Sequence, residues 1–391
     1  MNIALFSETY PPDINGVATS TQALFNVLNA HGHHAYVVTT QLTDKEKEVT
    51  FFDNIIRIPG IEFKQLYGYR IAGIYNPQAM KIIKRLKLDV IHVQTEAGIG
   101  IFGKTVARAL ELPIVYTYHT MYEDYTYYVT RGRIEGFARQ VVRNFSRGEA
   151  EKATEFITPS EKVKDIIRSY GYEGYINVVP TGIDFSRFEA SKINHEKLIE
   201  FKKNHQLEDK FILLSLGRVA KEKSIDVLLQ GYAEYLKTET VPTHFLVVGL
   251  GPALEDLKQL AHQLKIADHV SFLGPVSPDD TPFYYHLADL FISASISETQ
   301  GLTFMEAMAA GKMLLARYDE NLADVIKDGK TGFFFRNEKD FETQLNKVIN
   351  LDSGVREQMI KNAYQLVETY SLPRFYTNII EVYRRAIRHN F

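Results

Sequence analysis

The sequence predicts an α/β protein built from two doubly wound, Rossmann-like domains, and three observations predict this class. The chain has 391 residues, more than one hydrophobic core usually supports. Short apolar strands alternate with helix-length stretches, which is the order of a parallel sheet covered by helices on both faces. A segment with a proline and a glycine, residues 178–188, separates the alternation into two similar halves.

The first half supplies the first domain, which we expect over residues 1–185. Its predicted helices span residues 17–30, 77–86 and 100–110. Its predicted strands are short apolar runs at residues 3–6, 35–39, 55–58, 90–93, 114–118 and 155–158. Strands joined through helices run parallel, so their carboxyl ends should share one edge of the sheet.

The second half repeats this plan, and we expect the second domain over residues 190–371. The predicted strands are residues 211–216, 244–248, 270–273, 290–293, 313–316 and 332–335. The predicted helices are residues 224–236, 253–264, 280–287 and 303–310. Residues 372–391 carry the apolar stripe Ile379, Ile380, Tyr383 and Ile387 and predict a last helix, which we expect to cross back to the first domain. Two such domains are expected to face each other across a central cleft, because open α/β sheets bind ligands beyond the carboxyl ends of their strands.

Composition and charge exclude several classes of protein. With 45% hydrophobic and 24% charged residues, the chain is typical of soluble globular proteins. It contains no cysteine and therefore no disulfide and no thiolate metal site, which fits a reducing cytosol. A net charge of −3 gives no reason to expect a nucleic-acid partner. The sequence opens on a strand and has no run of 18 apolar residues, so we expect neither a signal peptide nor a membrane-spanning helix.

Two glutamates eight positions apart form the most informative motif. Glu298 follows the predicted strand at 290–293, and Glu306 lies in a helix that begins near Gly301 and Leu302. Free backbone N–H groups at this helix start favour a phosphate, and a carboxylate can accept hydrogen bonds from two vicinal hydroxyls. The spacing therefore suits a nucleotide-sugar site. The alternative is an ordinary helix entered through polar residues, with Glu298 near the helix dipole and Glu306 in solvent.

Other loops at predicted strand ends could complete such a site. Gly16 opens the helix after the first strand, where it would allow close approach of a ligand or simply form a turn. Arg218 and Lys223 lie between a strand and a helix and are placed to neutralise phosphates, although exposed cations are usually only solvated. The turn at residues 249–252 lacks the remaining glycine of a dinucleotide fingerprint and is weak by itself.

A histidine and an acidic pair need separate interpretations. His119 ends a predicted strand among several tyrosines and faces the proposed cleft, although a lone histidine is more often structural than catalytic. Asp279 and Asp280 could suggest a metal site, but their place beside two prolines is better explained as a helix N-cap.

Residues 63–88 predict a contact with anionic lipid, because cations alternate there with apolar and aromatic residues and no acidic residue intervenes. The cations are Lys64, Arg70, Lys81, Lys84, Arg85 and Lys87. A second basic run could extend the same face, with Arg131, Arg133, Arg139, Arg143 and Arg147. The alternative is an ordinary amphipathic surface helix preceded by a loop.

Taken together, these motifs resemble the retaining glycosyltransferases of family 4, with the two-domain GT-B fold, over nearly the whole chain. More narrowly, the segments at 119–129, 220–224 and 298–303 are similar to bacterial 1,2-diacylglycerol 3-glucosyltransferases. The resemblance implies that Arg218 and Lys223 bind the donor diphosphate, helped by backbone N–H groups of Gly301 and Leu302. It implies further roles in donor binding and catalysis, with Glu306 on the ribose, Glu298 on the sugar hydroxyls, Gly16 at the donor and His119 at the transferred sugar. Leu250 stands where the family usually has an acidic residue.

The same resemblance implies transfer of glucose from UDP-glucose to the 3-hydroxyl of 1,2-diacylglycerol, giving α-monoglucosyldiacylglycerol, a precursor of glycolipids and of the lipoteichoic acid anchor. It implies front-face attack with retention, no required cofactor and no metal site, although a divalent metal could stimulate. The enzyme would sit peripherally on the cytoplasmic face of the cell membrane, with anionic lipids as partners and a homodimer left open. Alternatives are another sugar or acceptor, such as UDP-galactose, a glycosylated lipid or a polysaccharide, a nucleotide-sugar 2-epimerase, and a non-catalytic partner subunit.

Overall fold

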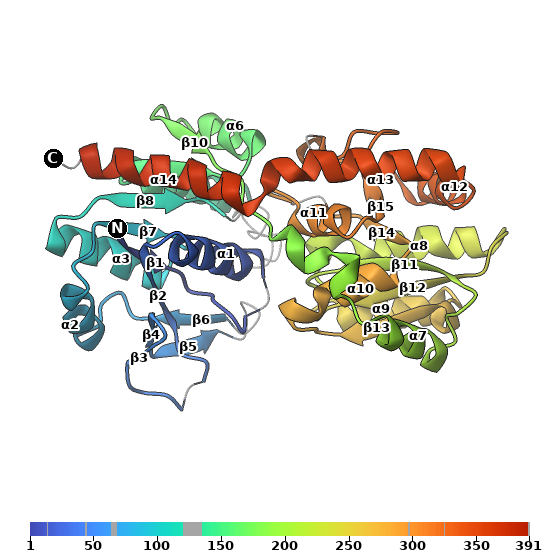
Figure 1. Cartoon of the computed structure of the whole chain (residues 1–391), viewed down its shortest axis with the longest axis horizontal. Helices are drawn as coiled ribbons and strands as arrows, with labels where there is room; N and C mark the ends of the chain where they lie inside the picture. Colours follow the sequence, from blue (N-terminus) through green and yellow to red (C-terminus); the bar gives the residue numbers. More distant parts are fainter. Residues whose placement is uncertain are drawn as a thin grey trace. The chain divides into compact units, whose positions relative to one another are not determined.

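The computed structural model describes residues 1–13, 15–43, 45–63, 69–119, 135–295, 298–323 and 325–389 (Figure 1). The chain divides into two compact units. The first unit comprises Met1–Gly182 together with Leu372–Phe391, and the second comprises Ile183–Ser371. Each unit is built on its own sheet, and the α/β class predicted from the alternation of strands and helices is confirmed.

The first unit contains an eight-stranded sheet in the order β10-β9-β8-β7-β1-β2-β4-β3. All neighbouring pairs run parallel except β3 and β4. The strands are β1 (Asn2–Phe6), β2 (His34–Thr40), β3 (Thr50–Phe52), β4 (Ile55–Ile58), β7 (Val90–Val93), β8 (Ile114–Thr117), β9 (Glu155–Thr158) and β10 (Ile176–Val178). A separate antiparallel hairpin joins β5 (Gly60–Phe63) to β6 (Tyr69–Ala72).

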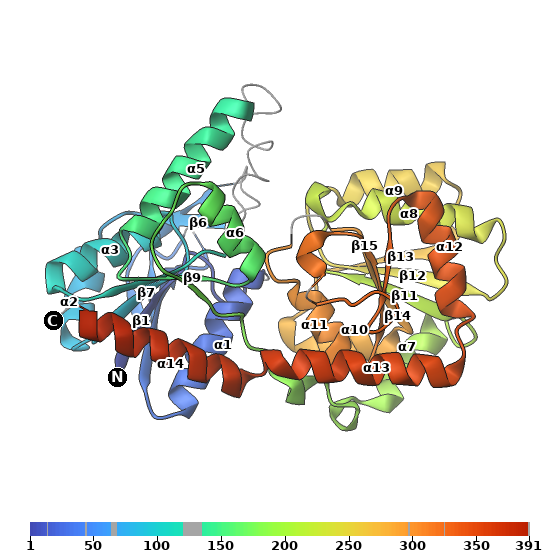
Figure 2. The ribbon, with the colours of Figure 1, turned by 90° about the horizontal axis from the view of Figure 1, so that it is seen from above.

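Helices cover both faces of this sheet because successive side chains of a strand point to opposite faces. On β1, Ala4 and Phe6 belong to the core under α2 (Pro77–Arg85), α3 (Gly98–Leu110), α5 (Glu135–Glu151) and α6 (Glu161–Ser169). Ile3 and Leu5 belong to the core under α1 (Gly16–Ala30) and α14 (Leu372–His389). Figure 2 shows these two helix layers on opposite sides of the sheet.

The last helix, α14, packs on the first unit through one apolar side. Phe375, Ile379, Ile380 and Tyr383 are buried, as the apolar stripe in the sequence favours. The hydroxyl of Tyr383 lies 2.7 Å from Nδ1 of His92 on β7, so α14 also has a buried polar contact with the central sheet.

The second unit contains a six-stranded parallel sheet in the order β13-β12-β11-β14-β15-β16. Its strands are β11 (Phe211–Leu216), β12 (Thr243–Val248), β13 (Val270–Gly274), β14 (Leu290–Ser293), β15 (Met313–Arg317) and β16 (Phe333–Phe335). Its α-helices are α7 (His195–Asn204), α8 (Ile225–Leu236), α9 (Leu254–Gln263), α10 (Thr281–Leu287), α11 (Leu302–Ala309), α12 (Glu338–Ile349) and α13 (Ser353–Val367). Two apolar clusters fill its two faces.

Short 3-10 turns connect several of these elements. They are η2 (Phe185–Phe188), η3 (Ala190–Lys192), η4 (Lys221–Lys223), η5 (Ala267–His269), η6 (Pro278–Asp280), η7 (Glu320–Leu322) and η8 (Glu368–Tyr370). Across the described ranges, no helix combines the length and the apolar character that a membrane span requires. The parallel strands of each sheet place their carboxyl ends at one edge, and the candidate site residues follow those ends.

Candidate active site

The start of α11 has the backbone geometry of an anion-binding site. Gly301 precedes the helix with φ of 75°, a left-handed conformation that glycine adopts without strain. Among the described residues, no side chain caps this helix start. Backbone N–H groups of the first turn are therefore directed at the position where a negatively charged ligand would be stabilised.

Two cations from the loop after β11 lie beside the glutamates of this region. Lys223 Nζ lies 2.6 Å from Glu298 Oε1, and this contact joins η4 to the loop before α11. Arg218 pairs with the buried carboxylate of Glu222, one turn further along. Arg218 also acts electrostatically on Glu298. The structure thus brings Arg218, Lys223 and Glu298 together, as the nucleotide-sugar interpretation requires.

The pKa values of the two glutamates are shifted in opposite directions. Burial by itself would raise the pKa of Glu298, but Lys223 and Arg218 hold that pKa below its ordinary value, so the carboxylate is charged. Burial raises the pKa of Glu306, against a hydrogen bond of 2.8 Å donated by the Tyr285 hydroxyl. The same hydroxyl oxygen lies 3.1 Å from the Thr303 carbonyl oxygen. Glu306 is therefore fixed in position on α11 by a buried tyrosine that the sequence did not single out.

The turn at residues 249–252 packs closely against the loop that follows β11. A Cβ on Gly249 would lie 1.8 Å from the Gly217 carbonyl oxygen, and a Cβ on Gly251 would lie 2.1 Å from the Val219 carbonyl oxygen. Only glycine permits this approach of two backbones. The turn therefore positions the loop that carries Arg218, and Leu250 at its tip is 57% exposed.

His119 lies in the first unit, at the carboxyl end of β8. Its Nε2 lies 2.6 Å from the Gln94 side-chain oxygen, which can only accept, so Nε2 carries the proton. Burial lowers the pKa of His119 to about 4, and the ring is neutral near pH 7.

Gly16 is exposed at the first position of α1, and Asn15 caps that helix by accepting from the Ala18 N–H.

Two buried glutamates at the same edge of this sheet were missed by the sequence analysis. Glu8 follows β1 and accepts hydrogen bonds from Thr95 Oγ1 and from the Ile99 N–H, each at 2.7 Å. Glu96 follows β7 and accepts from Tyr116. Burial raises the pKa of both carboxyls to about 7. Their place directly after a predicted strand was the available signal.

Two predictions need correction. Met80 and Ile83 are apolar residues of the segment 63–88 that was predicted to contact lipid, but they are 6% and 0% exposed and belong to the core of the first unit, because α2 uses its apolar side to cover the sheet. The predicted N-cap position is confirmed for Asp280, which precedes α10, but among the described contacts neither the Asp279 nor the Asp280 side chain makes a capping hydrogen bond. Ser277 instead accepts from the Asp279 N–H.

The remaining basic residues lie apart from these contacts. Lys81, Lys84, Arg85 and Lys87 are exposed on and after α2, consistent with a surface role. Arg70 is half-buried and donates to the Gly60 carbonyl at 2.9 Å within the β5–β6 hairpin. Lys64, Arg131 and Arg133 lie outside the described residues, while Arg139, Arg143 and Arg147 are on α5.

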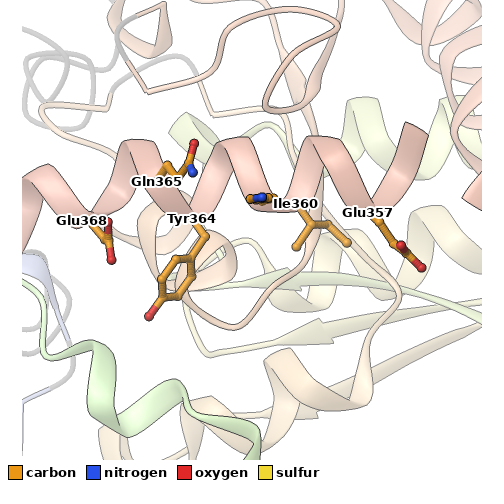
Figure 3. Close-up of a pocket in the computed structure, with 6 residues that line it drawn as sticks. Glu357, Ile360, Tyr364, Gln365 and Glu368 are labelled. Atoms are coloured by element: carbon orange, nitrogen blue, oxygen red, sulfur yellow. The ribbon is translucent and has the colours of Figure 1, made fainter. Parts of the chain in front are cut away.

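A hollow of about 530 Å³ lies along α13 in the second unit (Figure 3). Its lining residues come from α13 and from the first residue of η8, and they include none of the predicted site residues: Glu357, Ile360, Lys361, Tyr364, Gln365 and Glu368. A depression along a single helix offers no converging polar groups, so we assign it no role in the chemistry.

Solved structures identify the fold of this chain. HepE of Anabaena in complex with UDP-glucose matches with a TM-score of 0.76 at 16% identity, covering 97% of this chain and 98% of that one. Sucrose-phosphate synthase from Thermosynechococcus elongatus matches with a TM-score of 0.76 at 18% identity, covering 100% of both chains. These likenesses show the GT-B fold of glycosyltransferases.

Sequence relatives then define the family. Residues 14–187 match the model "Glycosyltransferase Family 4", and residues 196–366 match "Glycosyl transferases group 1". Alpha-monoglucosyldiacylglycerol synthase of Streptococcus pneumoniae is 36% identical, covering 100% of this chain and 87% of the relative. The synthase of the same name from Acholeplasma laidlawii is 34% identical, and the match covers 88% of this chain and 87% of the relative. The chain therefore belongs to glycosyltransferase family 4, which confirms the predicted family and enzyme class.

Proposed function

We propose that this enzyme transfers glucose from UDP-glucose to the 3-hydroxyl of 1,2-diacylglycerol with retention of configuration at the anomeric carbon. The full-length similarity to two alpha-monoglucosyldiacylglycerol synthases supports this donor and acceptor. The contact between Lys223 and Glu298 is the structural observation that carries the proposal, because it unites a phosphate-neutralising cation with a sugar-binding carboxylate.

The proposed chemistry follows from charge. Cleavage of the bond between the anomeric carbon and the diphosphate puts negative charge on the leaving UDP and positive character on the sugar. Arg218, Lys223 and the N–H groups at the start of α11 would stabilise the departing diphosphate. Glu298 would accept hydrogen bonds from the sugar hydroxyls, and Glu306 would hold the ribose.

The acceptor hydroxyl would attack on the side of the departing phosphate. The new glycosidic bond would therefore form on the same face of the sugar as the bond that breaks. The proton of the acceptor hydroxyl would pass to a phosphate oxygen of the departing UDP. His119 would contact the transferred sugar as a neutral ring, with Nε2 committed to Gln94. No proton transfer through this histidine is needed.

The acceptor places the proposed enzyme on a membrane. Diacylglycerol stays in the bilayer because each buried methylene contributes about 0.8 kcal/mol to its retention. The exposed cations of α2 would attract the first unit to the anionic cytoplasmic leaflet. No cofactor is required in this scheme.

A matrix of donors and acceptors tests the proposal. Purified protein is incubated with UDP-glucose, UDP-galactose or GDP-mannose and with vesicles containing diacylglycerol or glucosyldiacylglycerol, and products are identified by mass spectrometry. We expect glucosyldiacylglycerol from UDP-glucose and diacylglycerol, and NMR should show an α linkage in this product. Formation of an epimerised nucleotide sugar without acceptor, or a product only from another pair, would contradict it.

A further inference from the structure

Helix α5 carries an apolar stripe on its exposed side. Phe137, Val141 and Phe145 are 71%, 50% and 47% exposed. Residues four positions apart lie on one side of a helix, so the three side chains form a continuous row. Scattered exposed apolar residues are ordinary, but a row of this kind on one helix indicates a surface that another apolar phase covers.

The stripe is exposed because α5 is attached to the first unit through another side and mainly through its last turns. Ser146, Glu149 and Ala150 are buried. Glu149 pairs with Lys104 of α3 and, at 3.0 Å, with Lys152. Figure 2 shows α5 projecting from the rest of the first unit, with its amino-terminal half farthest from the sheet.

Further apolar residues are exposed on other elements that cover the same face of the sheet. Ile101 on α3 is 40% exposed, and Ile74 and Tyr75, just before α2, are 60% and 53% exposed. The Tyr75 ring packs edge-on against Phe102 of α3, with centroids 6.0 Å apart. The ion pair between Lys104 and Glu149 joins α3 to the last turns of α5, and both helices cover the same face of the sheet.

The charge of α2 and of the central part of α5 indicates the kind of partner. Neither residues 77–88 nor residues 136–148 contain an acidic residue. Their cations are Lys81, Lys84, Arg85, Lys87, Arg139, Arg143 and Arg147. Exposed aromatic and aliphatic groups beside cations fit the headgroup region of an anionic bilayer, where both terms favour binding.

We propose that α5 is a membrane-contact helix whose Phe137, Val141 and Phe145 enter the interface of a bilayer rich in anionic lipid. The inference rests on the proposed function, because it names the surface by which the enzyme reaches the membrane that holds its acceptor. It also assigns lipid insertion to exposed residues of α5, in place of Met80 and Ile83 of α2, which are buried.

The absence of tryptophan from the sequence allows a direct test. Phe137→Trp places a reporter on the stripe, and Ile199→Trp places one on α7 of the second unit at a position that is 68% exposed. With vesicles of phosphatidylglycerol and phosphatidylcholine, the first variant should show a blue-shifted emission that brominated lipid quenches, and the second should not. Equal responses of the two variants would overturn the proposal. A blue shift that grows with protein concentration without vesicles would show a second copy of the chain on the stripe and would also overturn it.

A matched pair of double variants measures the contribution to binding. Phe137→Ser/Val141→Ser should lower partition into these vesicles at least about tenfold, while Ile199→Ser/Val355→Ser, at 68% and 50% exposure, should leave it unchanged. Both pairs are exposed, so thermal unfolding should match the parent. Retained vesicle binding by the first pair would refute the membrane role of α5.

Glucosylation of detergent-dispersed diacylglycerol separates this inference from the proposed function. The Phe137→Ser/Val141→Ser variant should keep its activity there and lose activity on vesicles. If the parent glucosylates diacylglycerol and the variant matches it on vesicles, the inference fails alone. If the parent glucosylates no diacylglycerol under either condition, the proposed function fails.

Discussion

At the scale of single residues, the two glutamates of one motif have opposite environments. Glu298 contacts Lys223 and has a lowered pKa, whereas Glu306 accepts from Tyr285 and has a raised pKa. Both carboxyls are removed from solvent, so the charge of the hydrogen-bond partner, and not burial alone, decides the direction of each pKa shift. A ligand diphosphate would compete with Glu298 for Lys223, so donor binding should alter the charge balance at that carboxylate.

Substitution of the two glutamates should separate binding from turnover. We expect Glu306→Ala to weaken nucleotide binding by about 1–3 kcal/mol, because a ribose hydrogen bond to a buried carboxylate is lost. Glu298→Ala should mainly lower kcat, because the proposed contact is with the reacting sugar. Calorimetry with UDP and steady-state rates provide the two readouts. Unchanged affinity and rate in both variants would contradict the assignment.

Removal of Arg218 or Lys223, the two cations of the loop after β11, should lower activity strongly and selectively. Arg218→Ala or Lys223→Ala should lower kcat/KM by an amount equal to about 2–4 kcal/mol, since each contact is charge-assisted and partly desolvated. Lys221→Ala is the control, because Lys221 is exposed on the same η4 turn. Equal losses at all three positions would indicate a diffuse field instead of specific contacts.

Glu8 should make stability depend on pH. Burial raises its pKa from 4.5 to about 7, so between these values the folded state retains a proton that the unfolded state releases, and the free energy of unfolding falls as pH rises. Glu8→Gln removes this contribution and should gain roughly 3 kcal/mol relative to the parent between pH 4.5 and pH 8. Urea unfolding of both proteins at several pH values measures the difference. Because the buried histidines are present in both proteins, their contribution to the pH dependence cancels in this difference. A difference independent of pH would show that Glu8 has an ordinary pKa when folded.

At the scale of elements, strong periodicity was enough to predict most strands of both sheets. The short strand β3 has all three side chains exposed and β10 has only three residues, so neither carries the apolar run by which a strand is recognised. Helix α2 shows the converse difficulty. Its apolar and basic residues suit a membrane face and a core face equally well, and only tertiary packing decides that Met80 and Ile83 are covered by the sheet.

The candidate site was predictable in part for a similar reason. Glu298, Arg218 and Lys223 follow strand ends in the sequence, and parallel strands bring such loops to one edge. Tyr285 lies on α10 and reaches Glu306 across a helix contact. Glu8 and Gln94 gain their roles from neighbours distant in sequence. No local pattern specifies such long-range hydrogen bonds.

The exposed cations of α2 should contribute to vesicle binding without affecting the donor. Replacing Lys81, Lys84, Arg85 and Lys87 with serine should reduce binding to anionic vesicles and glucosylation of their diacylglycerol, since each cation contributes about 1 kcal/mol. UDP affinity should stay unchanged, because Arg218 and Lys223 lie in the second unit. Co-sedimentation in low and high salt measures the effect. Binding equal to that of the parent would leave α2 as a solvated helix.

At the scale of the whole molecule, the first unit depends on a helix that follows the second unit in sequence. Ile379, Ile380 and Tyr383 of α14 are 1%, 4% and 0% exposed and complete one of the two cores of that unit. Helix α14 is therefore a part of the first core, and its loss would expose the apolar residues of α1 and the sheet to water.

Deletion of residues from 372 onward should therefore damage the first unit. We expect lost hydrogen-exchange protection of β1, β2 and α1, with protection of β11, β12 and β14 retained. Tyr383→Phe is the control, because it removes the hydrogen bond to His92 and keeps the apolar packing. Persistent protection of β1 in the truncated chain would show that the first unit folds without α14.

This arrangement has a consequence for the order in which the enzyme matures during translation. The second unit is continuous, from Ile183 to Ser371, and can fold as soon as it leaves the ribosome. The first unit is synthesised earlier but lacks the α14 side of its core until the residues after 371 emerge. The half of the enzyme that is made first should consequently be the half that finishes folding last.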